Sequence, residues 1–403
     1  MATAAKYFDE DETMVANKIH ISRKIIHILH HAPPKNFSFW EGVLEGWHSK
    51  MSRALKKVNR DLWLECWQPT TNLVEKKSFE KDGIMYRLFY SAEPQFNSTI
   101  STGLLRALWK ECRKDENVII HLHGDRAILS YAILQLFAKK GHCVFLQHHG
   151  SNGKSIVSPL DNRLIKYSRR FYACCKQKIR YLETLGVEEE KMTVRTMGVD
   201  FQQFKPMDKK GAKLQLGINV DAFCVLYVAD FASTRGLVPV CEAFKKLERE
   251  DDMCLLLVGG SPRDPLYKYA ANLRGRYGKD KVYVRFRMPN SEMPLIYNAA
   301  DVMCWYSKSK ALWGGIGVSV MESLACDTPV VSNTLIHYPD IKEINFVGAI
   351  PSSETELKQC IERVMMRRAE MRCRESSIKH CDWTIIASET ISDYETYGGF
   401  RTD

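Results

Sequence analysis

A glycine-rich segment that runs into an acidic residue has the clearest potential for chemistry in this chain: Gly314-Gly315-Ile316-Gly317-Val318-Ser319-Val320-Met321-Glu322. Glycines that lead directly into a helix-like run expose backbone N–H groups at the helix start, where a diphosphate binds well. Glu322 falls about one and a half turns into that run. A carboxylate there can accept hydrogen bonds from two ribose hydroxyls. The alternative is an ordinary glycine-rich loop with a solvent-facing glutamate.

Histidines end two predicted strands in the first half of the chain. One strand ends in His121-Leu122-His123-Gly124, and the next ends in Gln147-His148-His149-Gly150. A neutral imidazole can hydrogen-bond a hydroxyl group or help its proton to leave. His149 is the first candidate for such a role, and His148 and His123 are further candidates. Alternatively, strand-end histidines merely cap a sheet edge.

Short β-rich runs alternate with amphipathic segments, which indicates parallel sheets with crossover helices. The pattern restarts near Gly198, where uninterrupted apolar runs are typical of buried parallel strands. The predicted strands are 24–30, 62–67, 117–123 and 141–147 in the first half, and 223–229, 253–258, 282–284, 302–305 and 328–332 in the second. The predicted helices include 42–58, 127–140 and 237–248.

We therefore predict an α/β protein with two Rossmann-like, doubly wound domains that face a cleft. Open α/β sheets bind ligands at the carboxyl ends of their strands, and a cleft between two such edges can close and exclude water. The expected divisions are a disordered leader (1–17), an acceptor-side domain (18–197), a donor-binding domain (198–378) and a helical segment that packs back on the first domain (379–403).

Charge and composition narrow the classes of partner. A net charge of +10 favours anionic partners, but the excess is spread out and no basic–aromatic motif accompanies it, so nucleic acid is not expected. The thirteen cysteines are scattered, which indicates reduced, buried thiols in a reducing compartment. The acidic segment Asp9–Glu12 is unlike a signal peptide, and no apolar run reaches membrane-spanning length. A cytoplasmic location is expected.

Two further groups of side chains each allow two interpretations. Basic residues at helical spacing would suit peripheral contact with an anionic membrane, although a solvated helix face is the plainer interpretation. Four tryptophans could stack on sugars, but their spacing is more typical of core and helix packing. The basic residues are Lys50, Arg53, Lys56, Lys57 and Arg60, and the tryptophans are Trp40, Trp47, Trp63 and Trp67.

Residues 223–333 resemble the C-terminal domain of family-4-type retaining glycosyltransferases, in the order and spacing of their motifs. The matching segments are Arg235-Gly236, Val258-Gly259-Gly260, Met293 to Val302, Gly317 with Glu322, and Ala325 to Val331. Upstream, Met197-Gly198-Val199-Asp200 is similar to the hinge segment of that family. The resemblance implies a GT-B fold.

The resemblance also implies roles for individual residues. Arg235 stands at the lysine position that contacts the donor diphosphate, the backbone of Gly317 and Val318 would offer donors to the phosphates, and Glu322 would hold the ribose. Gly259 and Gly260 end a donor-side strand. No obligatory metal and no cofactor is expected, because cations and a helix N-terminus neutralise the diphosphate.

On the first domain, the same resemblance places His149 near the reacting sugar and acceptor. The family's glycine-rich loop after the first strand is reduced here to Trp40-Glu41-Gly42, which makes Gly42 an acceptor-side candidate. His149, Arg235 and Glu322 are therefore the residues expected to carry the transfer.

Four positions depart from the family pattern, and one of them is Phe286, which stands near a glycine of a family turn. Asp230 replaces a phosphate-binding arginine, and a carboxylate beside a diphosphate is repulsive unless it is paired, for example with Arg235. Gly314 replaces a glutamate that contacts donor-sugar hydroxyls. Asp327 replaces a glycine, which is the mildest change because aspartate tolerates the left-handed conformation.

The predicted function is transfer of a sugar, with retention, from a nucleotide-diphosphate sugar to a glycan, lipid or small-molecule acceptor. Asp230 and Gly314 motivate a different hypothesis, a catalytically inactive GT-B scaffold that binds a partner. A third hypothesis is a GT-B enzyme of phosphorolysis or epimerisation, although no cofactor-lysine motif of the phosphorylase type is evident.

Overall fold

A computed structural model of the chain describes residues 23–30, 39–71, 78–91, 101–115, 117–124, 127–149, 165–184, 186–247, 252–286, 288–308 and 315–398. The expected leader 1–17 and the departure at Gly314 lie outside these residues. Within the described ranges, no helix is both long and apolar enough to cross a membrane.

The first half of the chain forms an eight-stranded sheet in the order β3-β4-β2-β1-β5-β6-β7-β8. Among the strands that the structure describes here, β3 and β4 alone pair antiparallel. The strands are β1 (Lys24–Leu29), β2 (Trp63–Thr70), β3 (Ser78–Lys81), β4 (Ile84–Tyr90), β5 (Ile119–His123), β6 (Cys143–Gln147), β7 (Arg170–Ala173) and β8 (Met192–Val194). The sequence did not predict the hairpin of β3 and β4, which extends one edge of the sheet.

The second half forms a six-stranded, fully parallel sheet in the order β11-β10-β9-β12-β13-β14. Its strands are β9 (Phe223–Val228), β10 (Met253–Val258), β11 (Val282–Arg285), β12 (Val302–Trp305), β13 (Val330–Ser332) and β14 (Gly348–Ala349). All six residues of β10 are buried, as expected of an apolar strand covered on both faces.

Both sheets have the doubly wound arrangement that the sequence predicted. In each, the chain leaves the first central strand in one direction and returns to its other side, so a switch point lies between β1 and β5 and another between β9 and β12. Ligands of such sheets bind outside the carboxyl ends of the strands at the switch point. His27 on β1 and His121 on β5 are register partners across the first switch point.

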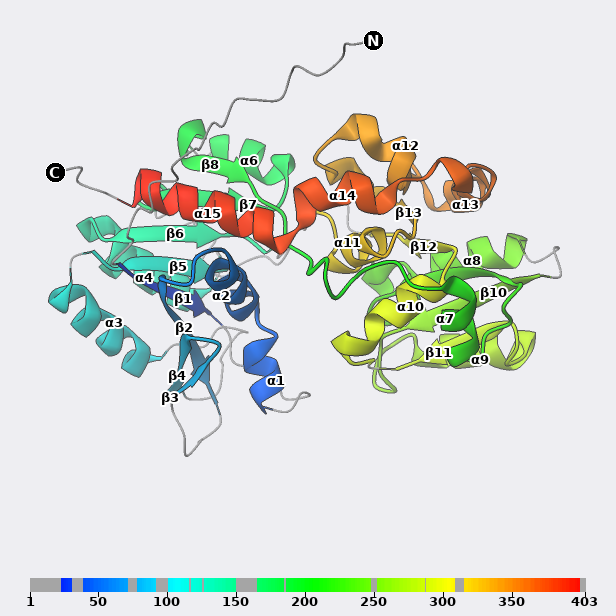
Figure 1. The fold of residues 1–403 in the computed structure, drawn as a ribbon, viewed down its shortest axis with the longest axis horizontal. Coiled ribbons are helices and arrows are strands. Elements are labelled where there is room, and N and C mark those ends of the chain that lie inside the picture. The colour runs from blue at the N-terminus through cyan, green and yellow to red at the C-terminus, as the bar shows by residue number, and fades with distance from the viewer. Residues whose placement is uncertain are drawn as a thin grey trace, which may run out of the picture.

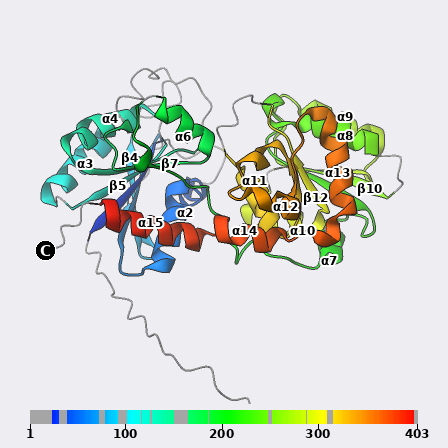
Figure 2. The same cartoon turned by 90° about the horizontal axis from the view of Figure 1, so that it is seen from above.

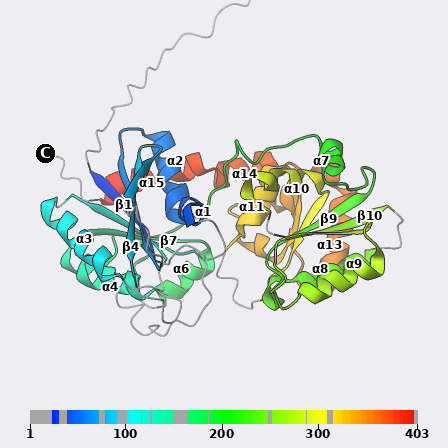
Figure 3. The same cartoon turned by 90° about the horizontal axis from the view of Figure 1, so that it is seen from below.

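Helices cover both sheets, as the three views show (Figures 1, 2 and 3). Those of the first half are α1 (Phe39–Leu44), α2 (Trp47–Val58), α3 (Thr102–Lys114), α4 (Ile128–Leu136) and α6 (Lys176–Glu183). Those of the second are α7 (Lys209–Gln215), α8 (Leu237–Leu247), α9 (Tyr267–Tyr277), α10 (Met293–Ala299), α11 (Val318–Ala325), α12 (Ile344–Val347), α13 (Leu357–Met366), α14 (Cys373–Cys381) and α15 (Trp383–Tyr397).

The single helix predicted for residues 42–58 is wrong in one respect, because the chain breaks it into α1 and α2. Gly46, the N-cap of α2, has an extended backbone with φ −63° and ψ 150°. A Cβ atom at Gly46 would lie 2.7 Å from the His48 ring, so the break brings the chain close to that imidazole. The break separates Gly42, on α1, from the side chains of α2.

Two chain segments cross between the halves. The linker around Val199 bridges to Asp382, and Trp383 N donates to Val199 O at 3.2 Å. From there α14 lies over the second half and α15 runs back along the first, where it packs on α2 (Figures 1 and 2). On α14, the Arg374 guanidinium donates to the carbonyls of Phe201 (2.8 Å) and Ala325 (2.7 Å), which ties the linker to the end of α11.

Candidate active site

A pocket of about 260 Å³ lies between the two halves and is lined by residues of both. From the first half come α2 residues that include Trp47, Lys50 and Arg53. The linker 198–204 and the start of α15 also line it, and Asn290, Val318 and Glu322 come from the second half. The pocket therefore joins three parts of the chain that are far apart in sequence.

Glu322 is the buried acidic group of this pocket, with 8% of its surface exposed. The Tyr297 hydroxyl, from α10, donates to Oε2 of Glu322 at 2.8 Å. Burial raises the pKa of the Glu322 carboxyl to about 6, while the hydrogen bond from Tyr297 and the charge of Lys50 act in the opposite direction. The carboxylate is held in place, and the pocket leaves it within reach of a small ligand.

Trp47 connects this pocket to the histidines of the first sheet. Its ring stacks on His149, with centroids 5.8 Å apart and planes 17° apart. The Lys50 ammonium lies 5.6 Å from the centre of the same indole and also pairs with Glu45 at 3.0 Å. An aromatic face beside an imidazole and a cation is suited to a polar ligand with an apolar face, such as a sugar.

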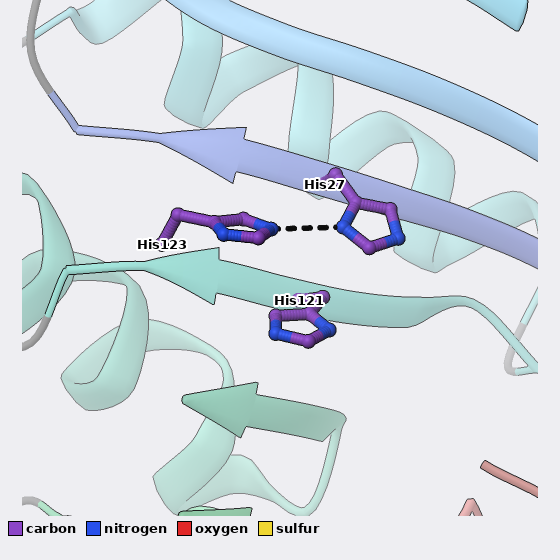
Figure 4. A group of neighbouring side chains, drawn as sticks. All are labelled: His27, His121 and His123. Atoms are coloured by element: carbon purple, nitrogen blue, oxygen red, sulfur yellow. Dashed lines mark hydrogen bonds between the residues drawn. The ribbon is translucent and has the colours of Figure 1, made fainter. Parts of the chain in front are cut away.

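His149 is the last of a series of ring contacts that begins deep in the first sheet. His27 and His123 are hydrogen-bonded (Nδ1 to Nε2, 2.9 Å), as Figure 4 shows with the neighbouring His121. His123 Nδ1 lies 3.0 Å from His149 Nε2, and His149 Nδ1 lies 3.0 Å from the Met197 sulfur. Both ring nitrogens of His149 therefore contact protein atoms, so a substrate atom that bonds to either nitrogen must share or replace a contact.

Burial sets the protonation of these rings. It lowers the pKa of His27 to about 3. Burial, followed by the neighbouring imidazoles, also holds the pKa of His121 and of His123 well below the usual range. All three rings are thus neutral at physiological pH, with one N–H and one bare nitrogen each.

Arg235 lies apart from this pocket, in an exposed 3₁₀ turn (Ser233–Arg235) that follows β9. The next residue, Gly236, has φ +77°, and a Cβ atom there would lie 2.0 Å from the Tyr306 carbonyl oxygen. The Tyr227 hydroxyl lies 3.1 Å from the carbonyl of Asp230 and 3.2 Å from that of Arg235, which fixes the turn. Asp230 and Arg235, both exposed and described, form no ion pair with each other.

Residues 208–376, most of the second half, match the family model described as "Glycosyl transferases group 1". Residues 208–376 form a group 1 glycosyltransferase domain. Solved structures extend the likeness to the whole fold. Sucrose-phosphate synthase from Thermosynechococcus elongatus superposes with a TM-score of 0.69 at 18% identity, over 93% of this chain and 98% of that one. The fold of the chain is GT-B.

Curated relatives match just under half of the chain. D-inositol 3-phosphate glycosyltransferase of Kribbella flavida is 28% identical over 43% of this chain and 42% of that protein. Phosphatidyl-myo-inositol mannosyltransferase of Mycobacterium tuberculosis is 22% identical over 49% of this chain and 57% of that protein. The match with this chain thus spans about half the length of these relatives.

Within the group 1 domain, Gly317 is the N-cap of α11, with φ −63° and ψ 143°, and as a glycine it makes no side-chain capping hydrogen bond. Val318, the first residue of α11, lines the pocket with Glu322. Gly315 has φ +64°, and a Cβ atom there would lie 2.3 Å from the Cys174 carbonyl oxygen of the first half. The glycine-rich segment thus makes a close contact between the halves and then starts the helix.

Gly259 and Gly260 shape the loop after β10 and do not line the pocket. Their φ values are +107° and +65°, and a Cβ atom would lie 2.5 Å from the Ala229 oxygen or 2.6 Å from the Phe231 ring, respectively. Asp264, which the sequence analysis passed over, accepts hydrogen bonds from the backbone N–H groups of Phe231 and Ser261, each at 3.0 Å. These contacts join the loops after β9 and β10.

Among the predicted acceptor-side residues, His123 belongs to the hydrogen-bonded rings, His148 is buried directly after β6, and Gly42 is buried within α1. Sequence reasoning missed Lys50 as a neighbour of Glu322, and it missed His27 and Tyr394 in the histidine cluster. No motif marks these residues.

The prediction for Asp327 is confirmed, since its φ is +59°. The prediction that the cysteines are buried thiols is also confirmed, because all thirteen are free and buried.

Proposed function

We propose that the chain is an active glycosyltransferase that moves a sugar from a nucleotide-diphosphate sugar to a glycan, lipid or small-molecule acceptor. The observation that carries this proposal is Glu322: a buried carboxylate on the first turns of a group 1 domain helix, turned into a pocket that both halves line. The relatives named above are glycosyltransferases, which supports the same reaction class.

We propose a uridine diphosphate sugar as the first donor to test. A structural neighbour from Anabaena was solved in complex with UDP-glucose, with a TM-score of 0.63 over 92% of this chain. In the proposed complex, Glu322 accepts hydrogen bonds from ribose hydroxyls. The N–H groups at the start of α11 receive phosphate oxygens, and Arg235, which lies outside the pocket, is the cation that the family resemblance assigns to the leaving diphosphate.

In the first half, we propose that the sugar being transferred packs against the Trp47 ring, next to His149. Retention of configuration and independence from metals are parts of the proposal that follow from the family resemblance. Independence from metals is consistent with a donor site that relies on Arg235 and a helix N-terminus for charge. Transfer in EDTA at an undiminished rate is the expected result.

The test is calorimetric titration of the purified chain with UDP, GDP and ADP, and then with their glucose conjugates, in EDTA. We expect one diphosphate to bind. Replacing Glu322 by alanine should weaken that binding by about 1–3 kcal/mol, because it removes hydrogen bonds to a charged acceptor. The exposed Glu375, on α14, provides the matched control, and Glu375→Ala should bind as the wild type does.

Two results would contradict the proposal. Unchanged affinity in Glu322→Ala would remove Glu322 from the nucleotide site. No binding of any diphosphate or its glucose conjugate by the folded wild type would favour the alternative, an inactive GT-B scaffold in which Asp230 opposes the phosphates.

A further inference from the structure

A chain of hydrogen bonds crosses the first half from α15 to the linker. The Tyr394 hydroxyl lies 3.4 Å from His27 Nε2, and His27 Nδ1 lies 2.9 Å from His123 Nε2. The chain continues through His123 Nδ1 to His149 Nε2 (3.0 Å) and ends with His149 Nδ1 at the Met197 sulfur (3.0 Å). Its members come from residues as far apart as 27 and 394, so only the folded chain assembles them.

The sulfur at one end fixes the direction of every bond. A thioether only accepts, so His149 Nδ1 must carry the hydrogen. In its neutral form His149 has a single N–H, so its Nε2 is bare and accepts from His123 Nδ1–H. The same step repeats: His123 Nε2 accepts from His27 Nδ1–H, and His27 Nε2 accepts from the Tyr394 hydroxyl.

The remaining buried ring fits the same direction. His121 Nδ1 contacts the Tyr394 oxygen, whose hydrogen is already given to His27, so His121 donates from Nδ1. Its other nitrogen, Nε2, is then the acceptor type and has no hydrogen-bond partner among the described residues. All four rings therefore carry hydrogen at Nδ1. Burial disfavours the charged form and so keeps His27, His121 and His123 neutral, which preserves the one-way pattern.

Three imidazoles at this spacing also raise the possibility of a metal site. The ligand nitrogens of His27, His121 and His123 all lie within 4.8 Å of one another. However, a metal ion must lie near the plane of each ring that binds it. The rings of His121 and His123 are stacked with planes 10° apart, and those of His27 and His121 with planes 23° apart (Figure 4). Lone pairs in stacked, nearly parallel planes do not converge on one ion, so the ring geometry favours the hydrogen-bonded chain.

We propose that His27, His123 and Tyr394 are positioning residues, which hold His149 in the tautomer with hydrogen on Nδ1. A thioether is a weak acceptor, so an oxygen atom of a bound substrate can replace the Met197 sulfur as the partner of that N–H. His149 then acts as a hydrogen-bond donor beside Trp47 and not as a base. The tautomer stands independently of catalysis; the exchange with substrate rests on the proposed function and deepens it.

The first test is nuclear magnetic resonance of the full chain labelled with ¹⁵N-histidine, which distinguishes a protonated ring nitrogen from a bare one. The His149 signal is assigned as the one missing from His149→Gln. We expect Nδ1 protonated and Nε2 bare in the wild type. His123→Phe removes the donor to His149 and should give a mixture of tautomers. His123→Asn, whose amide N–H stands in for Nδ1–H, should restore the single tautomer.

Circular dichroism of each variant shows that it is folded before its spectrum is compared. Hydrogen on Nε2 of His149 in the wild type, or the same single tautomer in folded His123→Phe, overturns the proposal. The same spectra with added Zn²⁺ test the competing explanation. Coordination of zinc by nitrogens of His27, His121 and His123 together would establish a metal site and overturn the proposed chain of hydrogen bonds.

The second test adds UDP-glucose to the labelled wild type, with calorimetry alongside. We expect the His149 Nδ1–H signal to shift as the sulfur is replaced, while the tautomer stays the same. An unchanged signal when calorimetry shows binding overturns the exchange with substrate. No binding at all contradicts the proposed function and, with it, the exchange, but leaves the tautomer result intact, so the two failures are distinguishable.

Discussion

The two halves of this molecule prepare their sites by different physical means. In the group 1 domain, backbone contacts dominate: Gly236, Gly259 and Gly260 each have a positive φ and sit where a Cβ atom would overlap a neighbour. In the first half, side chains dominate, and the hydrogen-bonded imidazoles run from β1 through β5 to the end of β6. A site shaped by backbone leaves glycines at fixed places in the sequence, whereas a site shaped by a side-chain network leaves ordinary residues.

Replacing Gly236 by alanine should give the largest effect, because the new Cβ would lie 2.0 Å from the Tyr306 carbonyl oxygen and 3.0 Å from its Cβ atom. A backbone atom cannot rotate away, so the turn that carries Arg235 must move. We expect the free energy of unfolding, measured in urea, to fall by about 3 kcal/mol or more, and nucleotide binding to weaken with it.

Gly217 provides the matched control for this prediction. Its φ of +68° is close to the +77° of Gly236, but nothing lies within 4 Å of its would-be Cβ atom. The free energy of unfolding of Gly217→Ala should therefore fall only by the cost of a left-handed alanine, about 1 kcal/mol. Equal losses in the two variants would mean that φ alone, and not the contact with Tyr306, explains why the turn needs glycine.

This difference also explains which parts could be predicted from the sequence. The second sheet followed from its apolar runs, and Gly317, Val318 and Glu322 could be placed on one helix because their spacing is local. The charge of Lys50 beside Glu322 could not be predicted, because Lys50 lines the same pocket from a helix of the other half, 272 residues away in the sequence. Pairing at that separation depends on how two sheets meet, which no local period encodes.

Of the hydrogen-bonded histidines, only those at strand ends, His123 and His149, were predicted. Each is followed by a glycine in the sequence, whereas His27 occupies an interior position of an apolar strand, where a histidine is normally a packing residue. Tyr394 lies on a helix that returns from the second half, and nothing in its own segment points to β1. The prediction of one continuous helix over 42–58 was wrong for a local reason, because Gly46 interrupts an otherwise helical pattern.

Replacing Glu322 by glutamine should have a smaller, pH-dependent effect on stability. Burial raises the pKa of this carboxyl from 4.5 to about 6 in the folded chain. The protonated carboxyl therefore contributes its full stability to the wild type below pH 4.5, and this contribution is lost as the pH rises through 6. Glutamine stays neutral, so the free energy of unfolding of Glu322→Gln should rise by about 2 kcal/mol relative to that of the wild type between pH 4.5 and pH 7.

Urea unfolding of both proteins at several pH values measures this change. The buried histidines affect both proteins alike and cancel in the difference. Glu375→Gln, on the exposed face of α14, should show no comparable rise. A flat difference for Glu322→Gln would indicate that Tyr297 and Lys50 offset burial fully, and that the Glu322 carboxyl is as easily ionised as a surface one.

Replacing Tyr394 by phenylalanine should have the smallest effect of the three, and it tests the other half of the molecule. The ring is fully buried and phenylalanine preserves its packing, so the variant loses only the hydroxyl that joins His27 and His121. We expect a loss of about 1 kcal/mol in urea unfolding, because two buried ring nitrogens lose a partner but can adjust. Tyr397→Phe, on the same helix and 36% exposed, should be close to neutral. If both substitutions are neutral, the Tyr394 hydroxyl does not stabilise the hydrogen-bonded histidines, and side-chain packing alone stabilises this part of the first half, as in an ordinary core.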